Sequence, residues 1–563
     1  MAKRLLVSLM ILGTILMGCK TDGDNKKNNF DVVVVGGGIA GMAAAVSAAE
    51  QGAKVVLVEK QPKVGGASAA GGAAFGAPGS RVQKAYPDIE DNASEWEKLW
   101  RLRSAQFIDT YKDGKYYNKN FPDYDAVRWL INGSPAIIDW LLNMGMTIGK
   151  PWTYSLDIIP RYHSISNPGY SQGDGVVRFL LERGKFLGVD VRVNAKAVKV
   201  LQEAGPGSRV TGIELADGTK ISANAVILAA GGFVSDTHKY GLDLDSRVFG
   251  GMDYLFGEGI DMGVDAGGVL WENPWGLNVG TTAAITGLQG TEAGIQIDPT
   301  KTYVNSTNNL RQGFGGSSPG VGANYATVAQ KEGGKLYALY TGAFTATTAA
   351  PDVLRLPTDA QLATGKVKKG DTVAELAAAL GIASKAADLQ KTIDAYNIVC
   401  DNIKAKLNLI VDPTNPTQAE DYSFLGVDPF EVEAANTNPV KWSKYGSYNS
   451  TGTTRRTYRR IEPGTGYYAV EVVPLFGGTY GGVKTLLGSA AVVKADEFVR
   501  KPGPNDPPVT AEDRIVLGLY AAGENANRNF FGYAYLSGGS SLQAISTGRA
   551  AGLSAAAYTR RLK

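Results

Sequence analysis

Three glycines and one carboxylate near the start of the chain have the types and spacing of a site for phosphate and ribose. Gly36, Gly38 and Gly41 give the spacing G-x-G-x-x-G directly after the apolar run 32–35. Such a turn lets the backbone approach a pyrophosphate, whose charge is stabilised by the N-terminal amides and dipole of the following helix. Glu59 ends the next β-branched run, where an acid can accept hydrogen bonds from a ribose diol. These residues predict dinucleotide binding.

The elements that must position these residues form a β-α-β unit. Residues 31–35 and 54–59 predict two buried strands, and the Ala-rich segment from Ile39 to about Gln51 predicts the helix between them. Residues 222–233 predict another buried strand that ends in a glycine pair. Residues 92–146 predict helices, one of which starts with Ser134 as its N-cap. The fold class expected is α/β, with a Rossmann-like parallel sheet.

A second loop of small residues indicates which dinucleotide is bound. Gly66, Ala67 and Ser68 follow Lys60 at a short distance and lead into a run of Gly and Ala through Gly76. A nicotinamide enzyme has no need of this loop, whereas a flavin that runs deep into the protein does. The cofactor expected is FAD.

Two segments near the C-terminus continue this pattern. They are Gly518-Leu-Tyr-Ala-Ala-Gly-Glu524 and Gly538-Gly-Ser-Ser-Leu542, the second of which opens a helix. With the N-terminal segments they resemble the FAD-dependent fumarate reductase-like flavoproteins, a family that also contains urocanate reductases and 3-ketosteroid Δ1-dehydrogenases. The resemblance extends from about residue 30 to residue 557.

This resemblance implies a non-covalently bound FAD, with Glu524 on the ribityl chain and the amides of 540–542 near the flavin pyrimidine ring. It also implies a Rossmann-like FAD-binding domain with an inserted α+β capping domain. Together the motifs and the resemblance place the following residues at the cofactor: Gly36, Gly38, Ile39, Ala40, Gly41, Glu59, Lys60, Gly66, Ala67, Ser68, Gly71, Gly72, Val198, Ala230, Gly231, Asp261, Glu524, Ser540, Ser541 and Leu542.

Near residue 273 the composition becomes rich in Gly, Thr, Asn and Ser, and this change indicates where the capping domain starts. The division expected is a lipoprotein signal peptide (1–18), a tether (19–29), the first part of the FAD-binding domain (30–272), the capping domain (273–465) and the second part of the FAD-binding domain (466–563).

The N-terminal segment resembles a bacterial lipoprotein signal. A basic start and an apolar run precede Leu16-Met-Gly-Cys19, so we expect Cys19 to be lipidated and the protein to be anchored outside the cytoplasm. A plain signal peptide or a short anchor is the alternative. Residues 21–29 are polar and would form a flexible tether.

Composition limits the partners. The chain has 57 basic and 54 acidic residues, and this balance argues against nucleic acid or another polyanion. Two histidines make a His-rich metal or bis-His haem site implausible, and no Cys-x-x-Cys-His motif for covalent haem occurs. We therefore expect no metal and an external electron donor, such as a quinol-linked protein, a cytochrome or an exported flavoprotein.

The chain departs from the fumarate reductases where they bind a dicarboxylate with two histidines and two arginines. The corresponding segments read Asn273-Pro-Trp-Gly, Gly477-Gly-Thr-Tyr480 and Ala534-Tyr-Leu-Ser-Gly-Gly539. The cationic groups that would hold two carboxylates are missing, so fumarate is not the main substrate expected.

The resemblance also suggests catalytic residues. Tyr535 and Gly539 match the Tyr-x-x-x-Gly of 3-ketosteroid Δ1-dehydrogenases, in which a phenol and a backbone N–H polarise a carbonyl. Arg311 resembles the arginine that protonates carbon in fumarate and urocanate reductases, with Glu292 as its relay acid. The alternatives are an aromatic residue that packs under the flavin and a solvated surface arginine.

The function expected is reduction of the C=C bond of an α,β-unsaturated carboxylate or carbonyl compound by hydride transfer from flavin N5. One alternative is the opposite direction, a ketosteroid-like Δ1-dehydrogenation. Another is an electron-transfer flavoprotein without substrate chemistry.

Overall fold

The computed structural model describes residues 28–563 apart from 73, 111–122, 155–156, 165–171, 242–243, 249–251, 272–274, 286–294, 299–310, 315–329, 331–332, 342–343, 348–349, 395–396, 399–460, 465, 504–505, 528–529 and 532–537. The N-terminal signal and Cys19 lie outside these residues. None of the described helices is long and apolar enough to span a bilayer.

The core of the first sheet is parallel. Its strands are nearly continuous apolar runs, as is typical of parallel strands whose two faces are both covered. Its order is β19-β20-β9-β1-β2-β6, and β1 (Asn29–Val35) pairs in parallel with both β2 (Val55–Val58) and β9 (Lys220–Leu228). The strands β20 (Ile515–Ala521) and β6 (Asp190–Arg192) extend the parallel set, while β19 (Ala491–Val493) is antiparallel. A meander of β7 (Ala197–Gln202) and β8 (Val210–Leu215) joins β9. The expected Rossmann-like α/β class is confirmed.

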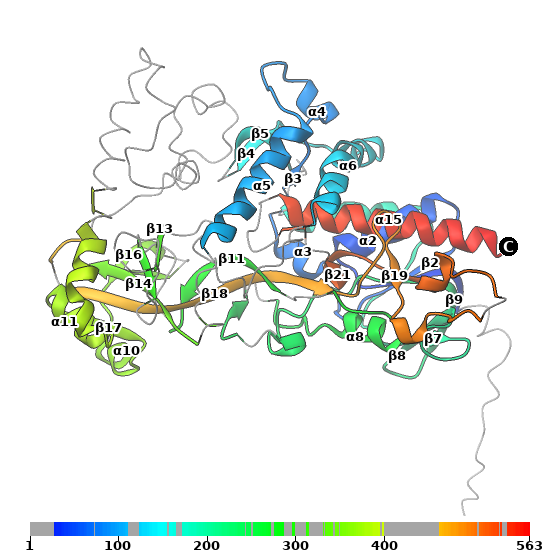
Figure 1. Ribbon diagram of the computed structural model, residues 1–563. Helices are drawn as coiled ribbons and strands as arrows, with labels where there is room; N and C mark the ends of the chain where they lie inside the picture. The colour runs from blue at the N-terminus through cyan, green and yellow to red at the C-terminus, as the bar shows by residue number, and fades with distance from the viewer. Residues whose placement is uncertain are drawn as a thin grey trace, which may run out of the picture.

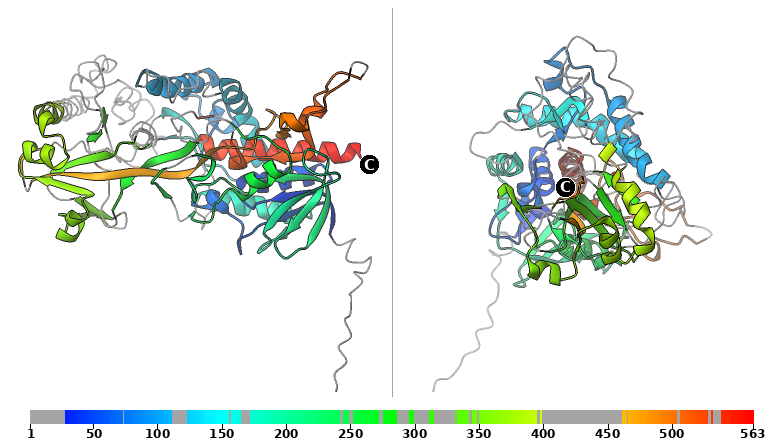
Figure 2. Two further views of the ribbon diagram at one scale, coloured as in Figure 1. Left: turned by 60° about the horizontal axis from the view of Figure 1, so that its bottom comes forward. Right: turned by 90° about the vertical axis from the view of Figure 1, so that its left-hand side faces the viewer.

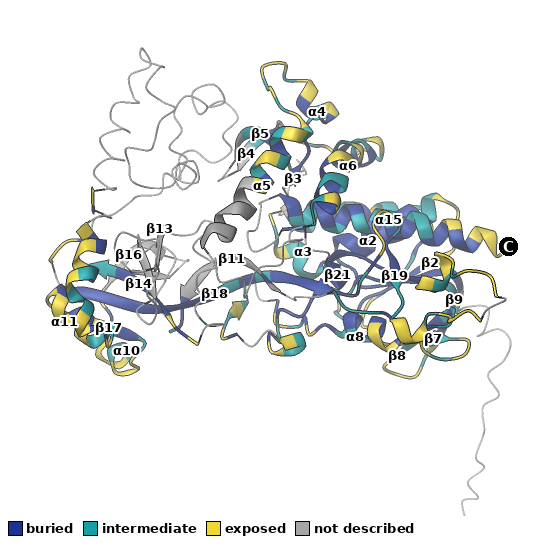
Figure 3. Cartoon of the chain, in the orientation of Figure 1, coloured by how far each residue is buried: buried dark blue, intermediate teal, exposed yellow. Residues whose placement is uncertain are grey.

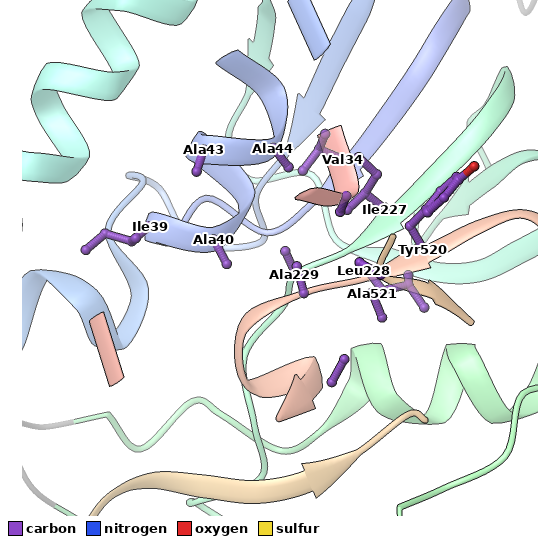
Figure 4. Packing of buried hydrophobic residues seen from close by; sticks show 14 of the residues in the cluster. Val34, Ile39, Ala40, Ala43, Ala44, Ile227, Leu228, Ala229, Tyr520 and Ala521 are labelled. Carbon is purple, nitrogen blue, oxygen red and sulfur yellow. The ribbon is translucent and has the colours of Figure 1, made fainter. Parts of the chain in front are cut away.

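Two helices lie together against this sheet. They are α2 (Ile39–Glu50), which connects β1 and β2, and the long C-terminal α15 (Gly539–Arg561). They approach so closely that a Cβ on Gly548 or Gly552 would come within 2.1 or 2.2 Å of a carbonyl oxygen of α2. On its sheet side, Ala44 of α2 points toward Val34 and Ile227 (Figure 4). This packing sets the helix N-termini relative to the ends of the strands.

A second sheet is built around β18 (Tyr467–Gly482), which extends from the α11 end of the molecule to β21 (Ala526–Asn527) (Figures 1 and 2). It pairs antiparallel with β14 (Leu336–Thr341), β17 (Val367–Gly370) and β11 (Trp275–Ala283), and β12 (Ile295–Asp298) and β13 (Arg311–Phe314) continue the sheet. The strand is buried over most of its length (Figure 3). β18 is therefore one continuous strand. It belongs to the second sheet, called the capping sheet below, and it also extends beside the end of β9.

The short strand β10 (Arg247–Val248) pairs in parallel with β18 in the second sheet. Two small sheets are formed by β3 (Phe75–Gly76), β5 (Asp157–His163) and β4 (Trp152–Tyr154), and by β15 (Phe344–Thr347) and β16 (Ala350–Arg355). The other helices are α3 (Gly66–Ala70), α4 (Arg81–Lys84), α5 (Ala93–Thr110), α7 (Gln172–Phe186), α8 (Glu258–Asp265), α10 (Asp359–Ala363) and α11 (Val373–Ala379).

One sequence expectation is wrong at α6 (Tyr124–Asn143). Ser134 does not cap a helix there, because α6 is continuous, begins after Asp123 and contains Pro135. Pro135 has no N–H to donate to the carbonyl of Ile131, and the Ser134 hydroxyl donates to that carbonyl instead, at 2.7 Å. The serine thus replaces the hydrogen bond that the proline removes.

Candidate cofactor site

A large cavity lies where the carboxyl ends of β1, β2 and β9 meet the N-terminus of α2. Its empty volume is about 820 Å³. It is lined by the 36–40 turn, the α3 segment, the end of β9, the start of α8 and the Gly523-Glu524 turn. Ligands of open α/β sheets bind at this edge, outside the carboxyl ends of the strands.

The glycine turn closes this edge tightly. A Cβ on Gly36, whose φ is +107°, would lie 2.3 Å from the carbonyl oxygen of Ala229. A Cβ on Gly41 would lie 1.9 Å from the carbonyl oxygen of Gly36. Only glycine fits at these two positions, so the turn and the helix start can lie directly on the strand ends. The backbone N–H of Ile39, the first residue of α2, donates to the hydroxyl of Ser68 at 3.1 Å.

Glu59 stands at the end of β2 on the same wall. It is 7% exposed, and its two carboxylate oxygens accept hydrogen bonds from the backbone N–H groups of Gly37 (2.7 Å) and Gln61 (2.8 Å). A carboxylate offers about four acceptor positions. Glu59 therefore remains able to accept hydroxyl donors from the cavity.

A cluster of charged side chains, Lys60, Lys196 and Glu258, lies at the edge of the cavity next to Tyr254. Lys60 Nζ donates to Glu258 Oε1 and Oε2 at 2.8 and 3.0 Å and to the Tyr254 carbonyl at 2.6 Å. Lys196 lies 3.5 Å from the same carboxylate. Burial is the largest single effect and disfavours the charged form of Glu258, but the hydrogen bonds to its carboxylate and the charges of Lys60 and Lys196 together outweigh it, so the pKa of Glu258 is lowered. The cluster ties together segments that are distant in the sequence.

Glu524 is a half-buried acid that lines the cavity. It accepts hydrogen bonds from the backbone N–H groups of Thr479 (3.1 Å) and Gly232. Glycines at 232 and 478 make room for it, because a Cβ at either position would lie 2.6 or 2.5 Å from a carboxylate oxygen. Burial raises the pKa of Glu524 to about 7, and the two backbone donors only partly oppose this shift.

A family comparison identifies the ligand of this cavity. Residues 31–542 match the family of the FAD-binding domain. The chain belongs to the FAD-binding domain family. It is accordingly an FAD-dependent oxidoreductase. None of the curated proteins compared matches the chain significantly.

Solved structures show the same fold at low sequence identity. One is a 3-ketosteroid Δ1-dehydrogenase from Sterolibacterium denitrificans in complex with 1,4-androstadiene-3,17-dione (TM-score 0.62, 17% identity, 94% of this chain and 100% of the other). A second is a 3-ketosteroid Δ4-(5α)-dehydrogenase from Rhodococcus jostii in complex with 4-androstene-3,17-dione (0.60, 19%, 96% and 99%). A third is an open flavocytochrome c3 fumarate reductase (0.52, 20%, 96% and 81%).

The residues present fit FAD. The cradle at Gly36, Gly38 and Gly41 is open to a pyrophosphate at the start of α2. Glu59 has acceptor positions left for a ribose, and Glu524 offers a half-buried carboxylate to hydroxyl donors. A carboxylate that has lost part of its hydration gains from a ligand that brings donors.

Most of the residues predicted at the cofactor lie on this cavity. Its lining contains Gly36, Gly38, Ile39, Ala40, Glu59, Lys60, Gly66, Ala67, Ser68, Ala230, Gly231 and Glu524, with Gly41 directly behind the turn. The lining does not include Gly71, Gly72, Val198, Asp261, Ser540, Ser541 or Leu542. The last three form the first turn of α15.

Two of these residues have side chains that do not line the cavity. Asp261 accepts hydrogen bonds from Lys239 Nζ (2.6 Å) and the Tyr240 hydroxyl (2.5 Å). Glu258, on the same turn of α8, lines the cavity instead. Val198 is 44% exposed, because alternation along β7 turns its side chain to solvent while Ala197 lines the cavity.

The catalytic candidates are only partly placed. Tyr535 and Glu292 lie outside the described residues. Arg311 begins β13 and pairs with Asp298 of β12. Gly539 is buried at the start of α15, where a Cβ would lie 2.3 Å from the ring of Phe531. Among the described residues no cluster of potential metal ligands occurs.

His163 is a buried residue with hydrogen-bond partners on both ring nitrogens. Its Nε2 lies 2.7 Å from the Ser80 hydroxyl and its Nδ1 lies 3.1 Å from the Phe75 carbonyl oxygen. Burial lowers the pKa of His163 to about 4, so the ring is neutral near pH 7.

The sequence interpretation missed Lys196, Tyr254, Glu258, Thr479 and Asn525. Glu258 stands in the segment Gly257-Glu-Gly-Ile-Asp261, in which only Asp261 was predicted at the cofactor. Thr479 lies in the segment 477–480 and Asn525 directly follows Glu524, whereas Lys196 and Tyr254 belong to no motif.

Proposed function

We propose that the protein reduces the C=C bond of an α,β-unsaturated carboxylate or carbonyl compound, and that fumarate is not its main substrate. Bound reduced FAD supplies the hydride from N5 to one carbon of the double bond, and a proton from the protein completes the saturated product. An external donor must return two electrons to the flavin after each turnover.

The observation that carries this proposal is the FAD-binding family match over residues 31–542, together with the cavity that ends at Glu524. The chain's own residues then supply the remaining roles. Arg311 holds the proton and Glu292 replenishes it. The Tyr535 hydroxyl and the Gly539 N–H polarise the substrate's carbonyl, since the N–H groups of a first helical turn are free of intrahelical bonds.

The cellular setting is part of the same proposal. Cys19 carries the lipid that holds the protein to the outer side of a bacterial membrane, and a quinol-linked protein, a cytochrome or an exported flavoprotein donates the electrons. FAD is held without a covalent bond, so acid precipitation of the protein should leave all of the flavin in the supernatant.

A second candidate is the reverse reaction, dehydrogenation of a ketosteroid-like ketone. The Tyr535-x-x-x-Gly539 spacing favours it, and two structures of similar fold are ketosteroid dehydrogenases.

Product analysis tests the proposal. The holoenzyme is supplied with electrons from reduced benzyl viologen, and each unsaturated acid or ketone is followed by mass spectrometry. A product heavier by two hydrogens supports the reductase. Formation of a product lighter by two hydrogens from saturated ketones, with an artificial acceptor, would support the second candidate instead.

A further inference from the structure

Asn525 is buried beside the catalytic cofactor's cavity but does not line it. The residue is 0% exposed and lies in the turn Gly523–Asn525, directly after Glu524. Its Oδ1 accepts a hydrogen bond from the backbone N–H of Ala230 at 2.5 Å. Ala230 itself lines the cavity at the end of β9. One side chain thus joins two segments that are 295 residues apart.

The amide is fixed on its other side by α8. A Cβ on Gly259 would lie 2.5 Å from Oδ1 and 2.7 Å from Nδ2, so the helix packs directly against the amide. Among the described residues, Nδ2 has no hydrogen-bond partner. A buried donor without a partner costs stability. An apolar side chain at position 525 would avoid that cost but could not accept the hydrogen bond from Ala230. We therefore attribute the asparagine to this hydrogen bond.

The hydrogen bond from Ala230 to Asn525 holds the backbone segment whose N–H groups surround Glu524. Ala230 leads through Gly231, whose φ is +85°, to Gly232, and the Gly232 N–H donates to the Glu524 carboxylate. Next along the chain, the Phe233 N–H donates to the hydroxyl of Thr479 at 3.1 Å, while the Thr479 N–H donates to Glu524. These hydrogen bonds link Glu524, Thr479 and the 232–233 backbone in a ring, and Asn525 holds the preceding residue, Ala230, from outside the ring.

We propose that Asn525 is a positioning residue for FAD, holding the 230–233 turn so that Glu524 presents its carboxylate to the cofactor. The inference rests on FAD occupying this cavity and is independent of the substrate. Among the described residues no lysine, arginine or histidine forms an ion pair with Glu524, so the backbone donors are what opposes the effect of burial on this acid.

FAD titrations of apoprotein between pH 5.5 and 8.5, followed by quenching of flavin fluorescence, test this role. Wild-type affinity should rise with pH through the titration of Glu524, because the ionised acid accepts the ribityl hydroxyls. Asn525→Ala, and Asn525→Leu with its volume nearly kept, should raise the FAD Kd by about 10- to 100-fold, since the Ala230 donor loses its partner. Both should move the midpoint of the pH profile upward, because the Gly232 donor is no longer held at Glu524.

Asn397→Ala is the matched control. Asn397 is also buried and makes two hydrogen bonds to the backbone of Ile461 at 2.8 Å, away from the cavity. It should change neither the Kd nor the midpoint. Weaker binding by the Asn525 variants with an unmoved midpoint, or binding within twofold of wild type, overturns the proposal. If neither variant is soluble, hydrogen exchange of the wild type decides: peptides covering 228–233 must gain protection when FAD binds. A wild type that binds no FAD would contradict the cofactor site itself.

Discussion

The carboxylate of Glu524 accepts a hydrogen bond from the backbone N–H of Thr479 at 3.1 Å, across 45 residues of sequence. The bond joins the turn after β20 to β18, the strand that also forms the capping sheet. Glu524, which lines the FAD cavity, is therefore hydrogen-bonded to β18, the strand that connects the capping sheet to the FAD-binding part. Four predictions follow from this arrangement and from the cavity around it.

The stability of the apoprotein should depend on the titration of Glu524. Burial raises the pKa of this acid from its ordinary value to about 7. Its folded state therefore binds a proton more tightly than its unfolded state, and the resulting stabilisation is present at low pH and lost as pH rises from about 4.5 to 7. The loss amounts to about 3 kcal/mol. Urea unfolding of the apoprotein should show this slope, and Glu524→Gln should flatten it. An equal slope in the variant would show that Glu524 is not the titrating group.

Gly36→Ala should abolish most FAD binding. The added Cβ would meet the Ala229 carbonyl at 2.3 Å and the backbone would have to leave φ +107°, so the turn must shift away from the pyrophosphate site. We expect less than about a tenth of the wild-type flavin content, measured as the ratio of 450 to 280 nm absorbance. Gly133→Ala is the control, because no atom lies within 4 Å of its added Cβ. Full flavin content in Gly36→Ala would place the pyrophosphate elsewhere.

Glu258→Gln should speed FAD release, whereas Asp261→Asn should not. The first change weakens the hydrogen bonds from Lys60 at the cavity edge, and the second affects only the contacts with Lys239 and Tyr240 outside it. For a partly exposed pair we expect about a two- to tenfold faster release. The rate is measured from the rise of flavin fluorescence after dilution, and added salt should accelerate release from wild type more than from Glu258→Gln. The opposite ranking of the two variants would restore Asp261 as the cofactor acid.

Tyr535→Phe should slow substrate reduction by about 10²- to 10³-fold while flavin content stays unchanged, because one donor to the developing oxyanion is lost. Tyr520→Phe is a control in a buried strand, where the hydroxyl donates to the Ser554 carbonyl oxygen at 3.4 Å. Rapid-mixing kinetics of the two variants separate the roles. An unchanged rate in Tyr535→Phe would leave this residue a packing role.

The parts of the site that depend on local backbone geometry could be predicted from the sequence. Gly41 is required by a contact with the Gly36 carbonyl within one β-α-β unit, and Gly36 by its φ of +107°, so their spacing was sufficient. Glu258 and Asp261 lie on one turn of α8, and only the position of Lys239 and Tyr240 decides which acid faces the cavity. No local pattern contains that information.

The same limit applies to long-range contacts. Asn525 meets Ala230 only because β20 and β9 are neighbours in the sheet, a pairing that the residue types do not encode. At α6 the sequence indicated a helix that starts at Ser134, because proline after a serine is typical of a helix start. The Ser134 hydroxyl bond to Ile131 allows the helix to continue, and this compensation could be found only from the coordinates.

The central claim is tested most directly by anaerobic reoxidation of the reduced holoenzyme. The protein is reduced with dithionite until the flavin is colourless and is then mixed with enones, cinnamates, urocanate or fumarate while absorbance near 450 nm is followed. We predict that one class of α,β-unsaturated carbonyl or carboxylate compound restores the oxidised spectrum rapidly and that fumarate does so far more slowly. A flavin that stays reduced with every unsaturated compound, but is bleached when the oxidised enzyme meets a saturated ketone, would contradict the reductase assignment.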